Sequence, residues 1–195
     1  MPLYTYDHRF GSSPLAEFDT QEKVEAFKLF TRRLAWWMGM STTGGIKELF
    51  ISLKEPLIQK WLKRHVNPGS EQLYYGARWP ETQLPEVGSA FKRFRGILQW
   101  SRDARTARWF AGLTDPNARQ QSDWLGGVLC QGHASGSAIL LDVDALSVLL
   151  GKHRQEFAAF EPNSDAFGIL DGTKHEGEIF TTGAVKAHVV EARLF

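Results

Sequence analysis

The sequence predicts an α+β fold, with helices in the first third of the chain and short strands with small helices after it. Before residue 70, apolar residues recur at the spacing of amphipathic helices. After residue 70, short apolar or aromatic runs alternate with turn residues, which is typical of strands. Because the helices come first and do not alternate with strands, βαβ units are not expected. We therefore expect a helical segment at 1–69 and a strand-rich region at 70–195.

Helices are predicted at three places in the first segment. Asp19-Thr20-Gln21-Glu22 is typical of a capping box before the first helix, and a second helix is expected over Ile46–Leu53. Pro56 suits the first turn of a third helix. The Gly44-Gly45 pair is interpreted as a linker, because it lacks the spacing of a phosphate-binding loop. The expected buried stripe of the first helix is Val24, Phe27, Thr31, Leu34, Ala35 and Met38.

The strand-rich region is expected to contain one clearly buried strand at 137–143, which is almost continuously apolar. A short helix should begin after Asp103, whose side chain can cap it, and end at Gly112. Another short helix is expected at 145–150. The remaining expected strands are Gln72–Ala77, Gly96–Trp100, Ile179–Phe180 and Ala184–Val190.

Composition excludes several classes of protein. The chain has 195 residues, 43% of them hydrophobic, which is enough to bury a core and argues against disorder. The net charge of +1 gives no basic footprint for stable nucleic-acid binding. Cys130 is the sole cysteine; it excludes an internal disulfide and is expected in the core. No apolar window is long enough to span a bilayer, and the N-terminus lacks signal-peptide features, so a cytoplasmic protein is expected.

Charged and metal-binding side chains give few further signals. Arg102, Arg105 and Arg108 follow helical spacing, which is typical of a solvated face, although they could also guide an anionic ligand. His133 is expected in a loop. The histidines and the cysteine have no metal-site spacing, so no metal is expected.

The most informative motif is Glu176-Gly177-Glu178, which lies directly before a predicted strand. Carboxylates two residues apart on an extended backbone point to the same side. One can hold a ligand hydroxyl and stabilise developing positive charge, while the other orients a nucleophile. The alternative interpretation is a solvated acidic turn before an edge strand.

The motifs follow an order that resembles the mono-ADP-ribosyltransferases of the Arg-Ser-Glu class, especially the small phage enzymes that modify host proteins. A strand with Leu-Tyr-x-Gly comes first, then a strand and helix ending Ala-x-x-Phe-Ala, an apolar strand, and Glu-x-Glu before a glycine turn. The resemblance spans roughly residues 57–192. It implies a split β-sandwich with an N-terminal helical segment, a catalytic core at 70–195, and NAD as the ADP-ribose donor.

The resemblance implies roles for both glutamates. Glu178 falls on the catalytic position, where the carboxylate bonds the nicotinamide-ribose 2′-hydroxyl and stabilises the positive charge that forms as nicotinamide leaves. Glu176 falls on the position that accompanies arginine as acceptor, because a carboxylate can orient a guanidinium.

The other two motifs depart from the family. The Ser-Thr-Ser motif falls on Gln99-Trp100-Ser101, so only its last serine is retained. The arginine of the first motif falls on Tyr75, which carries no charge, and we expect Arg78 or an arginine of 102–108 to reach the NAD pyrophosphate instead. The cofactor-binding residues that the resemblance implies are Tyr75, Gly76, Arg78, Gln99, Ser101 and Phe110.

These residues predict an NAD-dependent protein mono-ADP-ribosyltransferase that acts on a target protein with an accessible arginine. One alternative is a catalytically degenerate fold that binds a protein partner. Another is an ADP-ribosyltransferase that acts on nucleic acid through brief contact. We expect a monomer without membrane contact, located in the cytoplasm, or in that of the host cell if the protein is a phage protein, a secreted effector or a toxin.

Overall fold

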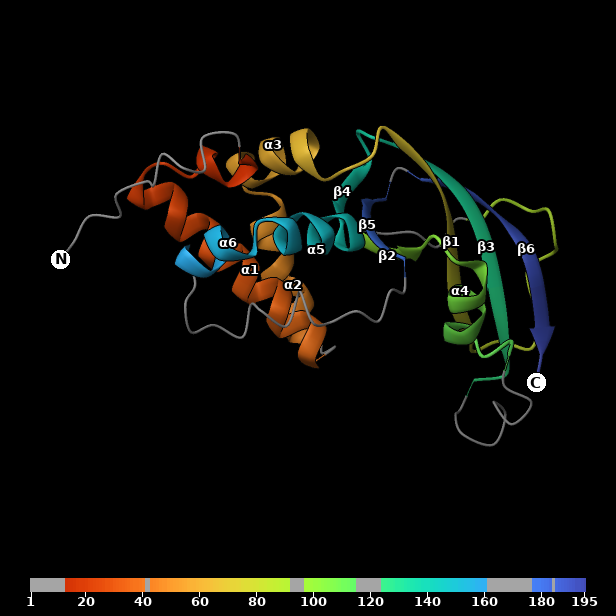
Figure 1. The fold of residues 1–195 in the computed structure, drawn as a ribbon. Helices are drawn as coiled ribbons and strands as arrows, with labels where there is room; N and C mark the ends of the chain where they lie inside the picture. Colours follow the sequence, from red (N-terminus) through yellow and green to blue (C-terminus); the bar gives the residue numbers. More distant parts are fainter. Residues whose placement is uncertain (1–12, 41–42, 92–96, 115–123, 161–176, 184) are drawn as a thin grey trace. The chain divides into compact units, whose positions relative to one another are not determined.

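The computed structural model describes residues 13–40, 43–91, 97–114, 124–160, 177–183 and 185–195. They confirm an α+β fold (Figure 1). The chain divides into a helical unit, drawn from 1–66 and 144–174, and a sheet unit, drawn from 67–143 and 175–195. The sequence predicts a single division at residues 69 and 70. The structure instead returns the chain to the helical unit at residue 144, because the helices at Val143–Lys152 and Arg154–Phe160 carry the fully buried Leu146, Leu150 and Phe157.

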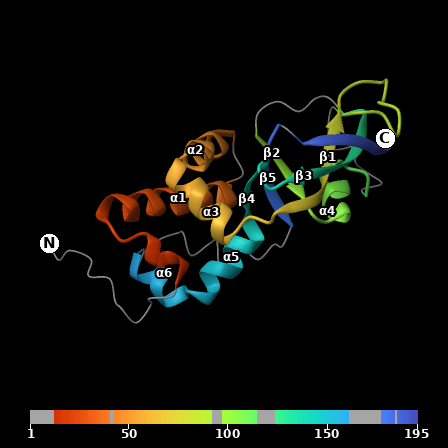
Figure 2. The ribbon, with the colours of Figure 1, turned by 90° about the horizontal axis from the view of Figure 1, so that it is seen from above.

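The helical unit confirms the three predicted N-terminal helices. The first begins one residue after Thr20, whose hydroxyl accepts a hydrogen bond from the Lys23 N–H at 3.4 Å. The second begins at Thr43, so the glycine pair predicted to be a linker lies inside a helix. The elements are a 3-10 helix at Pro14–Glu17, α1 at Gln21–Met40, α2 at Thr43–Leu53, α3 at Pro56–His65, α5 at Val143–Lys152 and α6 at Arg154–Phe160 (Figure 2).

Aromatic rings form the core of the helical unit. The Phe27 ring lies 5.4 Å from Trp61 and 6.2 Å from Phe157, so α1, α3 and α6 meet around it. Thr31 is fully buried in the predicted stripe, and its hydroxyl donates to the carbonyls of Phe27 and Lys28 at 3.2 and 3.0 Å. This local bonding explains how a polar residue is accommodated on a buried helix face.

The sheet unit contains one sheet of six strands in the order β4-β5-β2-β1-β3-β6, with antiparallel neighbours. Its two halves, β4-β5-β2 and β1-β3-β6, meet at a single described residue pair, Tyr74 with Ser101. The two separate sheets implied by a sandwich are therefore one divided sheet. Its elements are β1 at Ser70–Trp79, β2 at Ile97–Ser101, α4 at Ala104–Phe110, β3 at Gly126–Ser135, β4 at Ile139–Asp142, β5 at Glu178–Thr182 and β6 at Lys186–Leu194.

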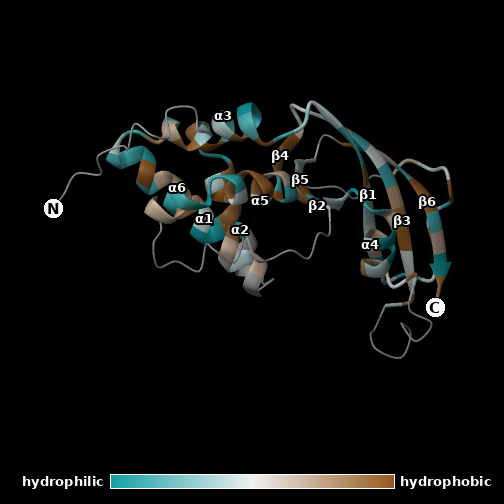
Figure 3. Cartoon of the chain, viewed as in Figure 1, coloured by the Kyte–Doolittle hydropathy of each residue, from teal (hydrophilic) through white to brown (hydrophobic). Residues whose placement is uncertain are grey.

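The two faces of the β1-β3-β6 half carry different layers. One face carries apolar side chains that include Leu73, Cys130 and Val189. The opposite face is covered in part by α4, which lies against β1 and β3 (Figure 2). Strand β4 is buried throughout and, like α5, is coloured largely as hydrophobic in Figure 3. Side-chain alternation along β1 therefore decides which residues share a face with the candidate site.

The prediction for His133 is wrong. His133 is expected in a loop, because its neighbours are glycine, alanine and serine, but it lies exposed in β3. Gly132 is required by packing: a Cβ there would lie 2.8 Å from Cγ1 of Val185. In sequence, the small residues around His133 are typical of a turn. In the structure they belong to a strand, and Gly132 is small because a neighbouring segment lies close to it.

Candidate active site

The candidate site is a row of three residues on neighbouring strands. Glu178 opens β5 and pairs with Ser101, the last residue of β2, and Ser101 pairs with Tyr74 in the middle of β1. Residues that pair directly across strands point to the same face of a sheet. Glu178 and Ser101 are buried, at 8% and 6% exposure, which removes most of the water that would otherwise screen the carboxylate charge.

A tight turn sets the position of Glu178. Gly177 has φ +63°, a conformation that favours glycine. Its carbonyl accepts a hydrogen bond from the Arg102 N–H at 2.8 Å. A Cβ on Gly177 would lie 3.1 Å from both the nitrogen and the Cβ of Arg102, so this close approach and the positive φ together favour glycine at the middle position of the Glu-x-Glu motif. Glu176, the first glutamate of that motif, lies outside the described residues.

Ser101 also contacts the residue that caps the next helix. Its Oγ accepts a hydrogen bond from the Asp103 N–H at 3.0 Å. Asp103 caps α4 as predicted, because its Oδ1 accepts from the Arg105 N–H at 2.8 Å. Gln99 lies two residues before Ser101 on the same face of β2, half-buried, and pairs with Phe180. The retained serine and the glutamine that replaces the first serine thus both face the side on which Glu178 lies.

Tyr75, the predicted cofactor-binding residue, does not face the side on which Glu178 lies, whereas its neighbour Tyr74 does. Tyr75 points to the opposite face, where its ring lies 5.5 Å from Trp100 and 6.2 Å from Phe91. Burial raises the pKa of Tyr75, as expected for a phenol in a core. Tyr74 is half-buried beside Ser101, and its hydroxyl accepts a hydrogen bond from Gln72 Nε2 at 2.9 Å.

Gly76 and Phe110 are both predicted to bind NAD. Gly76 lies where β1 contacts α4, and Phe110 is the last residue of that helix. A Cβ on Gly76 would lie 1.8 Å from the carbonyl oxygen of Ala107, so the absence of a side chain lets the helix approach the strand. Phe110 ends α4 with 40% exposure, and its ring lies 5.1 Å from that of Trp109. Gly76 therefore has a packing role.

The arginines expected to replace the missing motif arginine lie elsewhere or are ion-paired. Arg78 lies four residues beyond Tyr74 on β1, about 13 Å away, and the strand continues past it to Trp79 without the turn that would bring it back. Arg108 forms an ion pair with Glu191 at 3.2 Å. Arg102 binds two carboxylates, whereas Arg105 is exposed on α4. The arginine-rich segment 92–96 lies outside the described residues.

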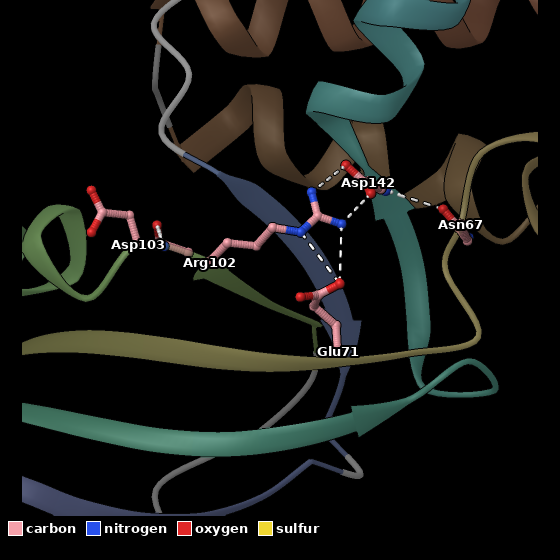
Figure 4. Close-up of polar contacts among 6 residues, drawn as sticks. Asn67, Glu71, Arg102, Asp103 and Asp142 are labelled. Atoms are coloured by element: carbon pink, nitrogen blue, oxygen red, sulfur yellow. Dashed lines mark hydrogen bonds and ion pairs between the residues drawn. The ribbon is translucent and has the colours of Figure 1, made fainter.

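Sequence reasoning missed the most extensive polar network near the site (Figure 4). Arg102 contacts Asp142 at the end of β4 and Glu71 near the start of β1. Asn67 completes the network, because its Oδ1 accepts from the Asp142 N–H at 3.1 Å. The only sequence signal for this network is Asp142, a polar residue directly after the apolar run 139–141. A polar residue at that place does not indicate that Arg102, 40 residues away, is its partner.

The remaining candidate chemistry concerns the cysteine and possible metal ligands. Cys130 is fully buried, as predicted, and burial raises its pKa to about 12, which excludes a reactive thiolate near neutral pH. Among the residues that the structure describes, no three histidine, cysteine or acidic side chains gather as metal ligands.

No described helix has the length and apolar character needed to cross a membrane. No protein-family model, curated protein or solved structure matches this chain.

Proposed function

We propose that this chain transfers ADP-ribose from NAD to an arginine side chain of a target protein and releases nicotinamide. The observation that carries the proposal is the pairing of buried Glu178 with buried Ser101 at adjoining strand ends. These are the positions on which the resemblance places the catalytic glutamate and the retained serine.

In the proposed reaction, Glu178 and Ser101 each have one role. NAD, when bound, supplies the ADP-ribose unit, and its bond to nicotinamide breaks with the electron pair leaving on nicotinamide. Glu178 accepts a hydrogen bond from a ribose hydroxyl and opposes the positive charge that develops at the anomeric carbon. Ser101 lies beside it and can donate a hydroxyl hydrogen bond to the carboxylate or to the ribose. The acceptor guanidinium, which Glu176 is proposed to orient, forms the new bond to the anomeric carbon through one nitrogen and loses a proton from that nitrogen to solvent.

The ribose end of NAD fits the site better than the pyrophosphate end. Among the described residues, the arginines nearest in sequence to Ser101 and Tyr74 are ion-paired, exposed on α4 or distant along β1. Burying a pyrophosphate without a cationic partner is costly. Together with the core position of Tyr75, this favours a second candidate: a protein-binding module that has kept the fold and lost NAD.

The deciding experiment is nicotinamide release from NAD by the wild-type chain and by Glu178→Gln. The substitution keeps the shape and removes the charge, and the loss of one preorganised electrostatic contact should lower turnover by ~10²–10³-fold. Glu86→Gln is the matched control, because Glu86 is exposed outside the strands. If the wild-type chain neither releases nicotinamide nor binds millimolar NAD by calorimetry, the binding-module candidate replaces the enzyme.

Glu176→Gln tests the acceptor in the same assay. The variant should release nicotinamide from NAD and fail to modify the arginine analogue agmatine, because the proposed task of Glu176 is to orient the acceptor. Equal loss of both activities would contradict that task. If both activities persist, Glu176 does not orient the acceptor. If the wild-type chain releases nicotinamide but leaves agmatine unmodified, arginine is not the acceptor, and single-stranded nucleic acid becomes the next acceptor to assay.

A further inference from the structure

Arg102 is held by two carboxylates from different strands. Its Nη1 donates to Oδ1 of Asp142 at 3.0 Å, and its Nη2 contacts the second oxygen of the same carboxylate. Nε and Nη2 lie 3.4 Å from Oε2 of Glu71. The planar guanidinium thus makes a bidentate contact with Asp142 and a longer contact with Glu71, as Figure 4 shows. This geometry fixes the orientation of the side chain as well as its charge.

The anchor of this contact is itself fixed. Asp142 is 2% exposed, and its backbone N–H donates to Oδ1 of Asn67. Nδ2 of Asn67 donates to the carbonyls of Leu140 and Ile139 at 3.1 and 3.3 Å. The end of β4 is thereby tied to the segment that leads into β1. Because the backbone of Asp142 is held and its carboxylate is buried, a displacement of Arg102 would leave a buried charge without this partner, which is costly.

The backbone of Arg102 contacts the turn that precedes Glu178. Its N–H donates to the Gly177 carbonyl at 2.8 Å, and the neighbouring residue, Ser101, pairs with Glu178. Gly177 already lies so close to Arg102 that no Cβ could be added without a shift. A displacement of Arg102 would therefore be transmitted to Gly177 and to the carboxylate that follows it.

We infer that Arg102 is a positioning residue, which fixes Glu178 by clamping its side chain to Asp142 and Glu71 while its backbone holds Gly177. The role of Glu178 in this inference rests on the proposed function. A solvated helix-face arginine, as the sequence suggests, would make none of these contacts. Hydrogen bonds to Asp142 also raise the pKa of Arg102.

The first test measures amide hydrogen exchange and does not depend on activity. In Arg102→Met, the amides of Glu178–Thr182 should exchange at least about tenfold faster through local opening, while those of β6 stay as in the wild type. Arg105→Met is the matched control, because Arg105 is exposed on α4. Wild-type exchange over Glu178–Thr182 in Arg102→Met would overturn the inference, and so would an equal increase across β6.

Two milder variants decide the question if Arg102→Met does not fold. Arg102→Lys keeps the charge and loses the planar fork, and Glu71→Gln weakens only the longer contact. Both should accelerate exchange in the same segment by less than Arg102→Met is expected to. An unchanged segment in both variants would assign Arg102 to general stability alone.

The second test uses nicotinamide release. Misplacement of a reacting group by about 1 Å can cost roughly 10²-fold in turnover, so Arg102→Lys should lower kcat with little change in the KM for NAD. A rise in KM at constant kcat would mean that Arg102 contacts NAD directly, which contradicts the positioning role. If the wild-type chain releases no nicotinamide, the proposed function fails, and the exchange measurement still decides whether Arg102 positions the turn.

Discussion

Consecutive tyrosines in β1 have different surroundings. Tyr74 lies beside Ser101 on the face that carries Glu178, and Tyr75 packs against Trp100 on the other face. Side chains alternate along a strand, so a shift of one residue in a motif exchanges a ligand contact for a core contact. The motif Leu-Tyr-x-Gly places its variable residue on Tyr75, and the sequence alone gives no reason to prefer Tyr74.

The two tyrosines can be compared by removing only their hydroxyl groups. Tyr74→Phe should raise the KM for NAD by about fivefold, the effect of one hydrogen bond of ~1 kcal/mol. Tyr75→Phe should leave KM within about twofold of the wild type, because its ring packs in the core. Initial rates of nicotinamide release at varied NAD concentration measure both. The opposite order of effects would restore the position that the motif predicts.

The resemblance of the motifs points to Glu178 and Ser101 as site residues, and the structure brings them together as strand neighbours. That pairing is compatible with the predicted site and does not test its chemistry. The clamp on Arg102 was not predictable, because its partners Glu71 and Asp142 lie 31 and 40 residues away in the chain. Local patterns report which residues form a strand or helix, but not which distant residue a side chain will meet.

At the scale of elements, predictions succeeded where one periodic pattern dominated. The first helix and the buried strand β4 follow from their apolar spacing, and α4 follows from its capping aspartate. Strand β3 was missed, although it pairs along the whole length of β1. Its glycines are typical of turns in sequence, but Gly127 is required because a Cβ would lie 2.2 Å from the carbonyl oxygen of Ala111.

The contact between α4 and β1 can be tested at Gly76. A Cβ there would overlap the carbonyl of Ala107, a backbone atom that can move only with the helix. We expect Gly76→Ala to lower the free energy of unfolding by about 1–3 kcal/mol, the usual cost of overpacking. Gly69→Ala is the control, because a Cβ at Gly69 has no atom within 4 Å. Urea denaturation followed by circular dichroism compares them, and equal stability would mean that α4 moves away without cost.

At the scale of the whole molecule, the sequence order of the segments does not match their assignment to units. The helical unit takes its residues from both sides of the first four strands, so the boundary predicted at 69 and 70 describes only one of the crossings between units. Helix α6 was missed because it is short and has no capping signal before Arg154. Its Phe157 is nevertheless fully buried against Phe27, a contact between residues that no local pattern connects.

That contact predicts how the returning segment stabilises the helical unit. Phe157→Ala removes a ring that packs edge-on against Phe27, and a buried phenylalanine truncated to alanine typically costs about 3–5 kcal/mol. Val148→Ala in α5 is the control: Val148 is 52% exposed, so its truncation should change the free energy of unfolding by less than about 0.5 kcal/mol. Urea denaturation measures both, and hydrogen exchange of α1 locates the effect. If Phe157→Ala were as stable as the control, α6 would not belong to the core of the helical unit, and residues 13–66 would have to bury their aromatic cluster without it.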